Sequence, residues 1–319
     1  MGKYISKRIL QALLVIFLVT IIAFLLMSVL PGDAAITILG MDAADAEKLQ
    51  AMREKLGLDK PLWEQYWTWF GNMFRGNFGN SFHYNRTVTE LLSDRILVTF
   101  CLGLVSLVFS FIVGILLGIV AAVHRNKPVD SVINVLANIG ASAPQFWICV
   151  LFIFLFASKM KLLPTQGYVA PGENFGQFLQ HMVMPVLVMS LPTVSMMTRQ
   201  TRAAMLDVIN EDFVRTARSK GLPEKMILYK HILRNALIPL LTLLGLSVGS
   251  LFAGSVLVEQ IYNIPGMGQL IVSAVMNRDT PIIQAVVVIM ATVITLTTLV
   301  VDIVYALVDP RIRISGASK

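Results

Sequence analysis

The chain has 319 residues, of which 56% are hydrophobic and only 14% are charged. A soluble protein of this length does not have that balance, so the composition excludes an ordinary soluble domain and favours a membrane protein. The net charge of +7 would suggest nucleic-acid binding in a soluble protein, but here the Lys and Arg residues gather in particular loops. This distribution indicates membrane topology, and we expect no nucleic-acid partner.

Six apolar runs are candidates for membrane-spanning helices. They cover approximately residues 9–30, 96–123, 132–157, 182–197, 237–258 and 282–308. We therefore predict an all-α, polytopic membrane protein with six transmembrane helices. Cys101 and Cys149 both lie inside these runs, where we expect packing residues and neither a disulfide nor a metal site.

Residues 31–95 are polar enough to lie outside the bilayer, and their pattern predicts two short helices. The first covers about residues 43–56 and ends at Gly57, and the second covers about residues 61–74. Four aromatic residues follow one face of the second helix: Trp63, Tyr66, Trp67 and Phe70. Two interpretations stay open, a dock for a binding protein or other partner, and an aromatic belt resting on lipid headgroups.

Alternation of the six spans places both chain ends and two of the loops on one side of the membrane. These segments hold the dense clusters of basic residues: Arg125 and Lys127; Arg199, Arg202, Arg215, Arg218, Lys220, Lys225, Lys230 and Arg234; Arg311 and Arg313. Basic loops stay in the cytoplasm, so we expect both termini there. The expected domains are a cytoplasmic N-terminus with the first span at 1–30, an extracytoplasmic segment at 31–95, a five-helix core at 96–308 with a cytoplasmic loop at 198–236, and a cytoplasmic tail at 309–319.

The cytoplasmic loop contains the longest densely charged segment of the chain, and its pattern predicts two short helices that meet at a corner. Charged residues near the start and end of the first helix suit the helix dipole: Glu211, Asp212, Arg218 and Lys220. Gly221 is placed to take the left-handed closing conformation, and Pro223 fits the first turn of the next helix. A corner of this kind outside the bilayer is a shape for docking onto another protein.

Small residues and prolines inside the spans affect how closely the helices pack and where they bend. Two runs have small residues at the spacing that lets helices approach closely: Gly114 and Gly118; Gly245, Gly249 and Ala253. They fit a seam with a second subunit as well as packing within this chain, and both interpretations stay open. Three prolines are expected to kink their helices: Pro144, Pro185 and Pro192.

No set of residues indicates catalysis, and we expect the chain not to be an enzyme. The four histidines lack the spacing of a zinc site: His83, His124, His181 and His231. No Gly-x-x-x-x-Gly-Lys-Ser/Thr phosphate loop is present, so ATP is not bound by that route. We also expect no buried charges of the kind that ion-coupled carriers place near mid-membrane; Asp302 comes nearest, and a structural role is favoured over a proton relay.

Residues 216–222 and 231–239 resemble the "EAA" coupling loop of ABC-importer permeases in its peptide/nickel-type form, Thr-Ala-Arg-x-Lys-Gly-Leu followed by His-x-x-Arg-Asn-Ala-Leu-x-Pro. The general motif has a carboxylate at Arg215 and a Leu-Pro pair at Leu233-Arg234, and both departures fit the peptide-permease form. Further segments resemble the B-type subunit of oligopeptide/dipeptide importers over nearly the whole chain: 31–33, 56–62, 65–66, 78–81, 163–164, 259–268, 277–279 and 309–312.

The resemblance implies the type I ABC importer permease fold and one permease subunit of an ATP-driven peptide importer in a bacterial or archaeal cytoplasmic (inner) membrane. It implies a second homologous permease subunit, two cytoplasmic ATPase subunits that bind the ATP, an extracytoplasmic solute-binding protein and membrane lipid as partners, and no cofactor in this chain. The loop residues that it assigns to ATPase coupling are Phe213, Arg215, Thr216, Ala217, Arg218, Lys220, Gly221 and Leu222.

In that assignment four residues are expected to form the surface seated in the ATPase: Phe213, Ala217, Gly221 and Leu222. Arg215, Arg218 and Lys220 form its charged rim, and movement of the loop drives alternating access. Import of nickel, glutathione or another small solute remains an alternative within the class. A stand-alone secondary carrier and a membrane-embedded enzyme are the alternatives outside it.

Overall fold

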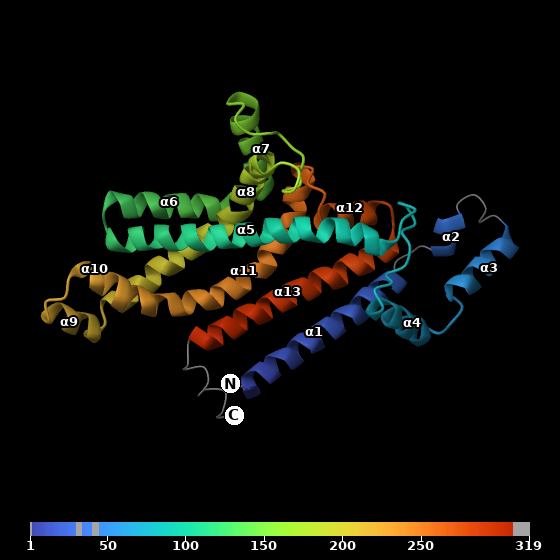
Figure 1. Ribbon diagram of the computed structural model, residues 1–319, viewed down its shortest axis with the longest axis horizontal. Helices are drawn as coiled ribbons and strands as arrows, with labels where there is room; N and C mark the ends of the chain where they lie inside the picture. Colours follow the sequence, from blue (N-terminus) through green and yellow to red (C-terminus); the bar gives the residue numbers. More distant parts are fainter. Residues whose placement is uncertain (1, 30–33, 40–44, 309–319) are drawn as a thin grey trace. The chain divides into compact units, whose positions relative to one another are not determined.

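The computed structural model describes residues 2–29, 34–39 and 45–308, and within them the regular structure is helical apart from one bridge between Asn80 and Thr87 (Figure 1). The helices are α1 Gly2–Val29, α2 Ala34–Leu39, α3 Ala46–Leu56, α4 Leu62–Phe74, α5 Val88–Val123, α6 Pro128–Ser142, α7 Gln145–Phe152, α8 Phe175–Ile209, α9 Asp212–Ser219, α10 Glu224–Met226, α11 Arg234–Ile261, α12 Met267–Met276 and α13 Thr280–Val308. Two π-helical segments, Ile153–Lys159 and Ile227–Leu233, continue α7 and lead into α11. The motif expected at residues 31–33 and the tail at 309–319 lie outside the described residues.

Five helices of the described chain are long and apolar enough to cross a membrane, namely α1, α5, α8, α11 and α13. A sixth crossing is completed if α6 and α7 together form one broken span. On that count the structure agrees with the six transmembrane helices that the sequence predicts.

The third span is broken where the sequence predicts a kink. The axes of α6 and α7 differ by 107°, and Figure 1 shows α7 turning away from the line of α6. Ala143 has extended backbone angles, as the residue before a proline prefers, and Pro144 begins the next helix. By contrast, α8 continues as one helix through Pro185 and Pro192 and ends only at Ile209.

The two short helices α3 and α4 have the ends that the sequence predicts, within a few residues. The side chain of Asp45 accepts hydrogen bonds from the backbone N–H groups of Glu47 and Lys48 and so caps the start of α3. Gly57 ends α3 with a φ of 69°. The short helix α2 was not expected, and α5 begins at Val88, ahead of the apolar run, because its first turns are polar and extend beyond that run.

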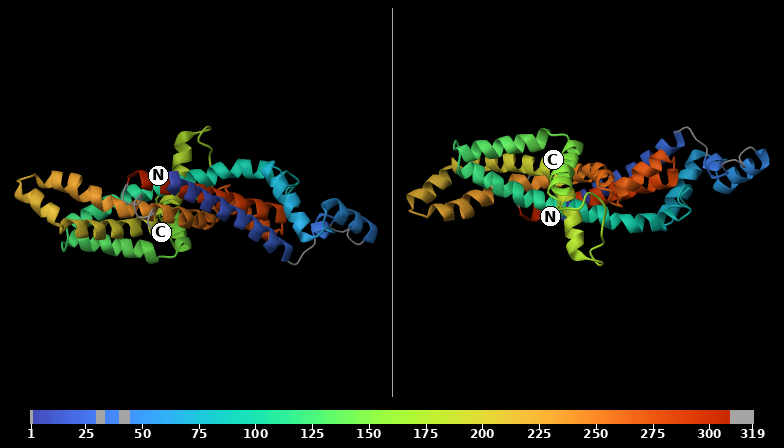
Figure 2. Two further views of the ribbon diagram at one scale, coloured as in Figure 1. Left: turned by 90° about the horizontal axis from the view of Figure 1, so that it is seen from below. Right: turned by 90° about the horizontal axis from the view of Figure 1, so that it is seen from above.

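Contacts between residues divide the chain into two compact units, each with its own packing. The first contains the described parts of Met1–Ile9, Thr99–Ile264 and Leu296–Lys319, and the second contains those of Leu10–Val98 and Pro265–Thr295. In the first unit α8 packs against both α6 and α11 (Figures 1 and 2). The corner formed by α9 and α10 lies at the far end of this group, beyond the ends of α5 and α6 in both figures.

The small residues of α5 pack against α8 within this chain. A Cβ built on Gly114 would lie 2.5 Å from Cβ of Met197, and one on Gly118 would lie 2.7 Å from the carbonyl oxygen of Thr198. On the fifth span, Gly245 faces Val301 of α13. Gly114 and Gly118 therefore serve internal packing, which decides between the two interpretations for this pair.

Replacing Gly118 by leucine is expected to destabilise the folded chain by about 1–3 kcal/mol, the usual cost of forcing extra atoms into a filled contact. The thermal midpoint of unfolding in detergent, followed by helical circular dichroism, measures this loss. Gly71→Leu is the matched control, since a Cβ at that helical position meets no atom within 4 Å. Equal midpoints for the two variants would show that α5 and α8 do not pack closely at Gly118.

The second unit has a separate core in which the start of α5 packs with α12 and the start of α13. Five of its fully or nearly fully buried residues are Val88, Leu92, Met267, Leu270 and Ile282. Ser81 links the loop before α5 to this core. Its hydroxyl donates to Oδ2 of Asp279 at 2.5 Å and accepts from the N–H of Tyr84 at 2.8 Å. Asp279 is buried at the start of α13, so the loop before α5 and the loop before α13 are joined by one carboxylate.

Candidate functional site

The corner loop, residues 210–226, takes its shape from Gly221. This residue has a φ of 72°, in the left-handed region where a side chain causes strain. Its N–H donates to the carbonyl oxygen of Arg218 at 2.9 Å, and the N–H of Leu222 donates to that of Ala217 at 3.4 Å. This pair of bonds is the Schellman arrangement that closes a helix C-terminus. Pro223 occupies the residue position immediately before α10, so the predicted glycine corner is confirmed in both position and conformation.

The inner face of the corner loop packs against the ends of the neighbouring helices. One buried cluster joins residues of α5, α8, α9, the second π-helical segment and α11: Ala122, Met205, Val214, Ala217, Ile227, Ile232 and Ala236. Leu222 packs against the same cluster from the corner itself. Because buried contacts of this kind do not deform freely, α9 cannot move without disturbing α5, α8 and the start of α11.

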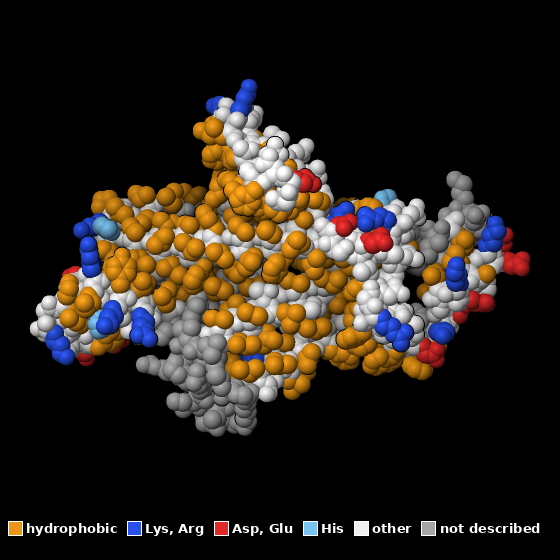
Figure 3. Space-filling view, viewed as in Figure 1, with side chains coloured by type: hydrophobic (Ala, Val, Ile, Leu, Met, Phe, Trp, Pro, Cys, Tyr) orange, Lys and Arg blue, Asp and Glu red, His pale blue; other side chains and the backbone are white. Residues whose placement is uncertain are grey.

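The outer face of the corner loop is exposed and mostly basic. Phe213 is 42% exposed, and the side chains of Arg215 and Lys220 are open to solvent. Nε of Arg218 lies 2.9 Å from Oε1 of Glu224, so an ion pair bridges α9 and α10 across the corner. Both partners are largely exposed, so this pair orients the two helices more than it stabilises them. Figure 3 shows Lys and Arg side chains gathered over α9 and α10, while hydrophobic side chains cover α5 and α6.

Two residues expected on the seated surface belong to the inner face. Ala217 is only 5% exposed, and Leu222 is half-buried against the same cluster. For Ala217 the expectation of an outward surface is wrong, because Val214 and Ala217 are spaced three residues apart on the apolar side of a short amphipathic helix. That spacing was visible in the sequence. Leu222 remains partly exposed. The outward surface is formed instead by Phe213 and its polar neighbours, with Gly221 exposed at the corner.

A buried ion pair ties α6 to α8 near the corner loop, and the sequence did not reveal it. Nε and Nη2 of Arg202 each lie 2.7 Å from one oxygen of Asp130, which is 4% exposed. The same carboxylate accepts from the backbone N–H of Asn126 at 3.1 Å and from Nδ2 of Asn134 at 2.7 Å. The sequence placed Arg202 in a cytoplasmic loop, whereas α8 carries it one turn before Met205 of the buried cluster.

A second buried carboxylate lies near the other end of α11. Glu259 is fully buried and accepts a hydrogen bond from the hydroxyl of Thr99 in α5 at 2.7 Å. Just beyond it, the backbone oxygen of Tyr262 accepts from the N–H of Gly167 at 2.8 Å, and burial raises the pKa of the Tyr262 phenol. Glu259 lies in the last turn of α11, which extends past the predicted end of its apolar run to Ile261, so the sequence did not identify it as part of this span.

Asp302 of α13 has a partner inside the first unit. Its Oδ2 lies 3.1 Å from Nη1 of Arg8 in α1. A structural role through an internal partner is one of the outcomes that the sequence predicted. The pair joins the first and the last described helices of that unit and gives the carboxylate a counter-charge.

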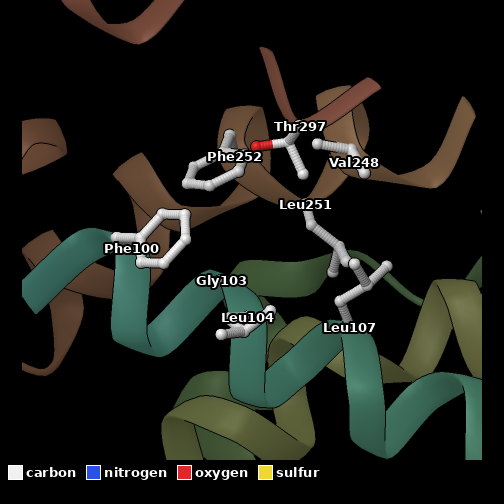
Figure 4. Close-up of a pocket in the computed structure, with 8 residues that line it drawn as sticks. All are labelled: Phe100, Gly103, Leu104, Leu107, Val248, Leu251, Phe252 and Thr297. Carbon is white, nitrogen blue, oxygen red and sulfur yellow. The ribbon is translucent and has the colours of Figure 1, made fainter. Parts of the chain in front are cut away.

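Metal-binding groups and an apolar hollow were the other candidates for a site in the described chain. Among the described residues, no group of three or more His, Cys, Asp or Glu side chains is placed to hold a metal ion. A small hollow lies between α5, α11 and α13, with Phe100, Leu104 and Phe252 among its lining residues (Figure 4). Its lining is apolar except for Thr297, so it gives a charged solute little to bind.

The helical spans, with a packed, basic corner between α8 and α11, define a polytopic membrane protein. Residues 114–314 match the family described as binding-protein-dependent transport system inner membrane component, and residues 1–103 match the N-terminal component of such systems. The chain belongs to this family of ABC importer permease subunits. Membership implies a multi-pass location in the inner membrane, with ATPase and binding-protein subunits as partners.

Relatives match the chain over almost its full length. A probable peptide ABC transporter permease protein, y4tP of Sinorhizobium fredii, is 38% identical over 313 residues, covering 98% of this chain and 100% of the relative. The glutathione transport system permease protein GsiC of Escherichia coli is 39% identical over 313 residues, covering 98% and 99%. An inward-facing structure of the MetNI methionine ABC transporter has a TM-score of 0.56 at 18% identity, covering 69% of this chain and 96% of that chain. This likeness confirms the predicted importer permease fold.

Proposed function

We propose that this chain is the permease subunit of an ATP-driven importer of peptides and forms half of its translocation pathway. The observation that carries the proposal is the full-length identity to permeases named for peptide transport in Sinorhizobium fredii and Brucella abortus. Glutathione import is the second candidate, favoured by the identity to GsiC. Both substrates carry peptide bonds and charged ends, so they belong to one chemical class. Nickel import remains a further alternative within the same permease class.

The proposed assembly contains a second, homologous permease subunit, two cytoplasmic ATPase subunits and an extracytoplasmic binding protein. Both termini of this chain are on the cytoplasmic side, as the clusters of basic residues in its loops indicate. ATP binds to the ATPase subunits, so this chain carries no cofactor and catalyses no reaction itself.

The corner loop is the proposed contact with the ATPase. Phe213 and the exposed side chains of Arg215, Thr216, Arg218 and Lys220 would bind the partner, with Gly221 setting their direction. Ala217 and Leu222 would connect that surface to the buried cluster. ATP-driven displacement of α9 is then carried into α8 and α11, and the pathway opens to alternate sides of the membrane.

Reconstitution into vesicles tests the proposal by showing whether ATP or an ion gradient drives uptake. In vesicles that contain this chain with its second permease, ATPases and binding protein, we expect ATP to drive uptake of a labelled dipeptide or of glutathione. The chain alone, under a proton or sodium gradient, is expected to accumulate neither, because the energy comes from a different polypeptide. Accumulation by the isolated chain would identify a secondary carrier and overturn the proposal. The ligand held by the binding protein decides between the two substrates.

A further inference from the structure

We infer that α4 is an interfacial anchor whose exposed aromatic face lies in the lipid of one leaflet, beside the C-terminal half of α1. This inference rests on α1 being a membrane span and not on the proposed function. The sequence alone does not decide whether this face contacts a protein partner or lipid. The contacts of α4 within the second unit favour lipid.

One side of α4 packs against the middle and the C-terminal half of α1. The hydroxyl groups of Tyr66 and Thr20 are 2.9 Å apart, and the rings of Trp69 and Phe24 have centroids 5.9 Å apart. Phe70 and Phe17 form an edge-to-face pair with centroids 6.0 Å apart, and Figure 1 shows α4 beside the end of α1. Residues 17–24 all lie inside the 25-residue apolar span Tyr4–Ser28.

This packing sets the depth of α4. Thr20 precedes Ser28, the last residue of the apolar span, by two turns, which is about 12 Å along a helix. The span is longer than the hydrocarbon layer by only about 7 Å. Tyr66 therefore lies below the level where hydrocarbon gives way to headgroups. A helix held at this depth contacts lipid wherever neither its own chain nor a partner subunit covers it.

The uncovered side of α4 has the chemistry that this position requires. Trp63 and Trp67 are 64% and 54% exposed, and Phe74 is exposed on the same side, the three lying within about 40° of one another around the helix. Beside these aromatic residues on the helix circumference lies a polar edge with Glu64 and Thr68, which we expect to face water. Aromatic rings beside a polar edge are typical of helices that lie in the membrane interface.

Charged residues flank α4 at both ends. Lys60 precedes the helix and Arg75 follows it, and both are exposed. Long basic side chains at such positions extend to lipid phosphates while the helix stays in the apolar layer. The preceding helix α3 has no buried residue, carries charges at both ends and fits the aqueous side. If Trp63 and Trp67 instead bound a partner protein from the aqueous side, we would expect them on the water-facing edge of α4, which carries Glu64.

Quenching of single tryptophans tests the assignment. The chain has four tryptophans, so three Trp→Phe changes leave one reporter, at position 63, 67 or 69. The full-length chain is placed without other proteins in vesicles of phosphatidylcholine brominated on its acyl chains, so that the reporter is the single tryptophan present. We expect Trp63 and Trp67 to lose most of their emission to bromine and to resist iodide in the water. Trp69, half-buried against Phe24, is the matched control and should be quenched less.

A charge placed on each side of the helix gives a second measurement. Trp67→Asp, with Trp63 as the single reporter, is expected to lift α4 toward water and make Trp63 accessible to iodide. Thr68→Asp on the polar edge should leave Trp63 in the lipid. The inference is overturned if Trp63 and Trp67 are quenched by iodide and not by bromine, or if they are shielded from both, as a docked protein would shield them.

Discussion

Gly221→Pro is expected to abolish uptake while leaving the amount of chain in the membrane unchanged. Proline fixes φ near −65°, whereas Gly221 requires a φ of 72°, so the corner cannot form. Proline also removes the N–H that donates to the carbonyl oxygen of Arg218 at 2.9 Å. α9 would then leave its present direction, and the exposed surface around Phe213 would no longer face its partner. Uptake by reconstituted vesicles and immunodetection of the chain in membranes measure the two effects.

Two further variants at Gly221 separate backbone conformation from side-chain bulk. A Cβ at this position meets no atom within 4 Å, so bulk alone should be tolerated. Asparagine adopts the left-handed region readily and should retain most of the uptake. Valine has to be strained by about 1–2 kcal/mol, and we expect a loss of about tenfold.

Normal transport by Gly221→Pro would remove the corner loop from the mechanism. Crosslinking gives an independent readout: in a background without Cys101 and Cys149, Phe213→Cys should crosslink to the ATPase, and the Gly221→Pro change should remove that crosslink. A crosslink that persists would mean that the loop binds its partner without the corner.

The sequence predicted those features whose cause is local. Apolar length alone determines which segments cross a membrane, so the six spans were found with ends correct to a few residues in most cases. The corner at Gly221 was found because a glycine that follows a helical segment and precedes a proline is typical of one helix ending and another beginning. The short helices α3 and α4 were found for the same reason, from turn residues and aromatic spacing.

The features that the sequence missed depend on residues that are distant in the chain. Asp130 and Arg202 are 72 positions apart, and Ser81 and Asp279 are 198 apart, so no local pattern shows that they meet. Pro144 breaks its span while Pro185 and Pro192 do not break α8, because packing around each proline decides whether the helix continues. The inward direction of Ala217 is set by the buried cluster that it shares with Met205 of α8.

Arg202→Met is expected to destabilise the folded chain by about 3–5 kcal/mol, because it leaves the carboxylate of Asp130 buried without its counter-charge. Asp130 is 4% exposed, and the remaining bonds from Asn126 and Asn134 do not neutralise it. Asp130→Asn should cost less, since the Arg202 side chain is 25% exposed and can turn toward water. The midpoint of unfolding in mixed micelles measures both changes.

The double variant Asp130→Leu/Arg202→Met distinguishes a packing role from a role in transport. Apolar side chains can fill the space of a buried pair at little or no cost, so stability should return to near that of the natural chain. Arg202 lies one turn before Met205, which packs against the corner loop, so α8 would again hold that cluster in place. We therefore expect uptake to return together with stability. A stable double variant that does not transport would instead show that the charges of this pair act in the conformational change itself.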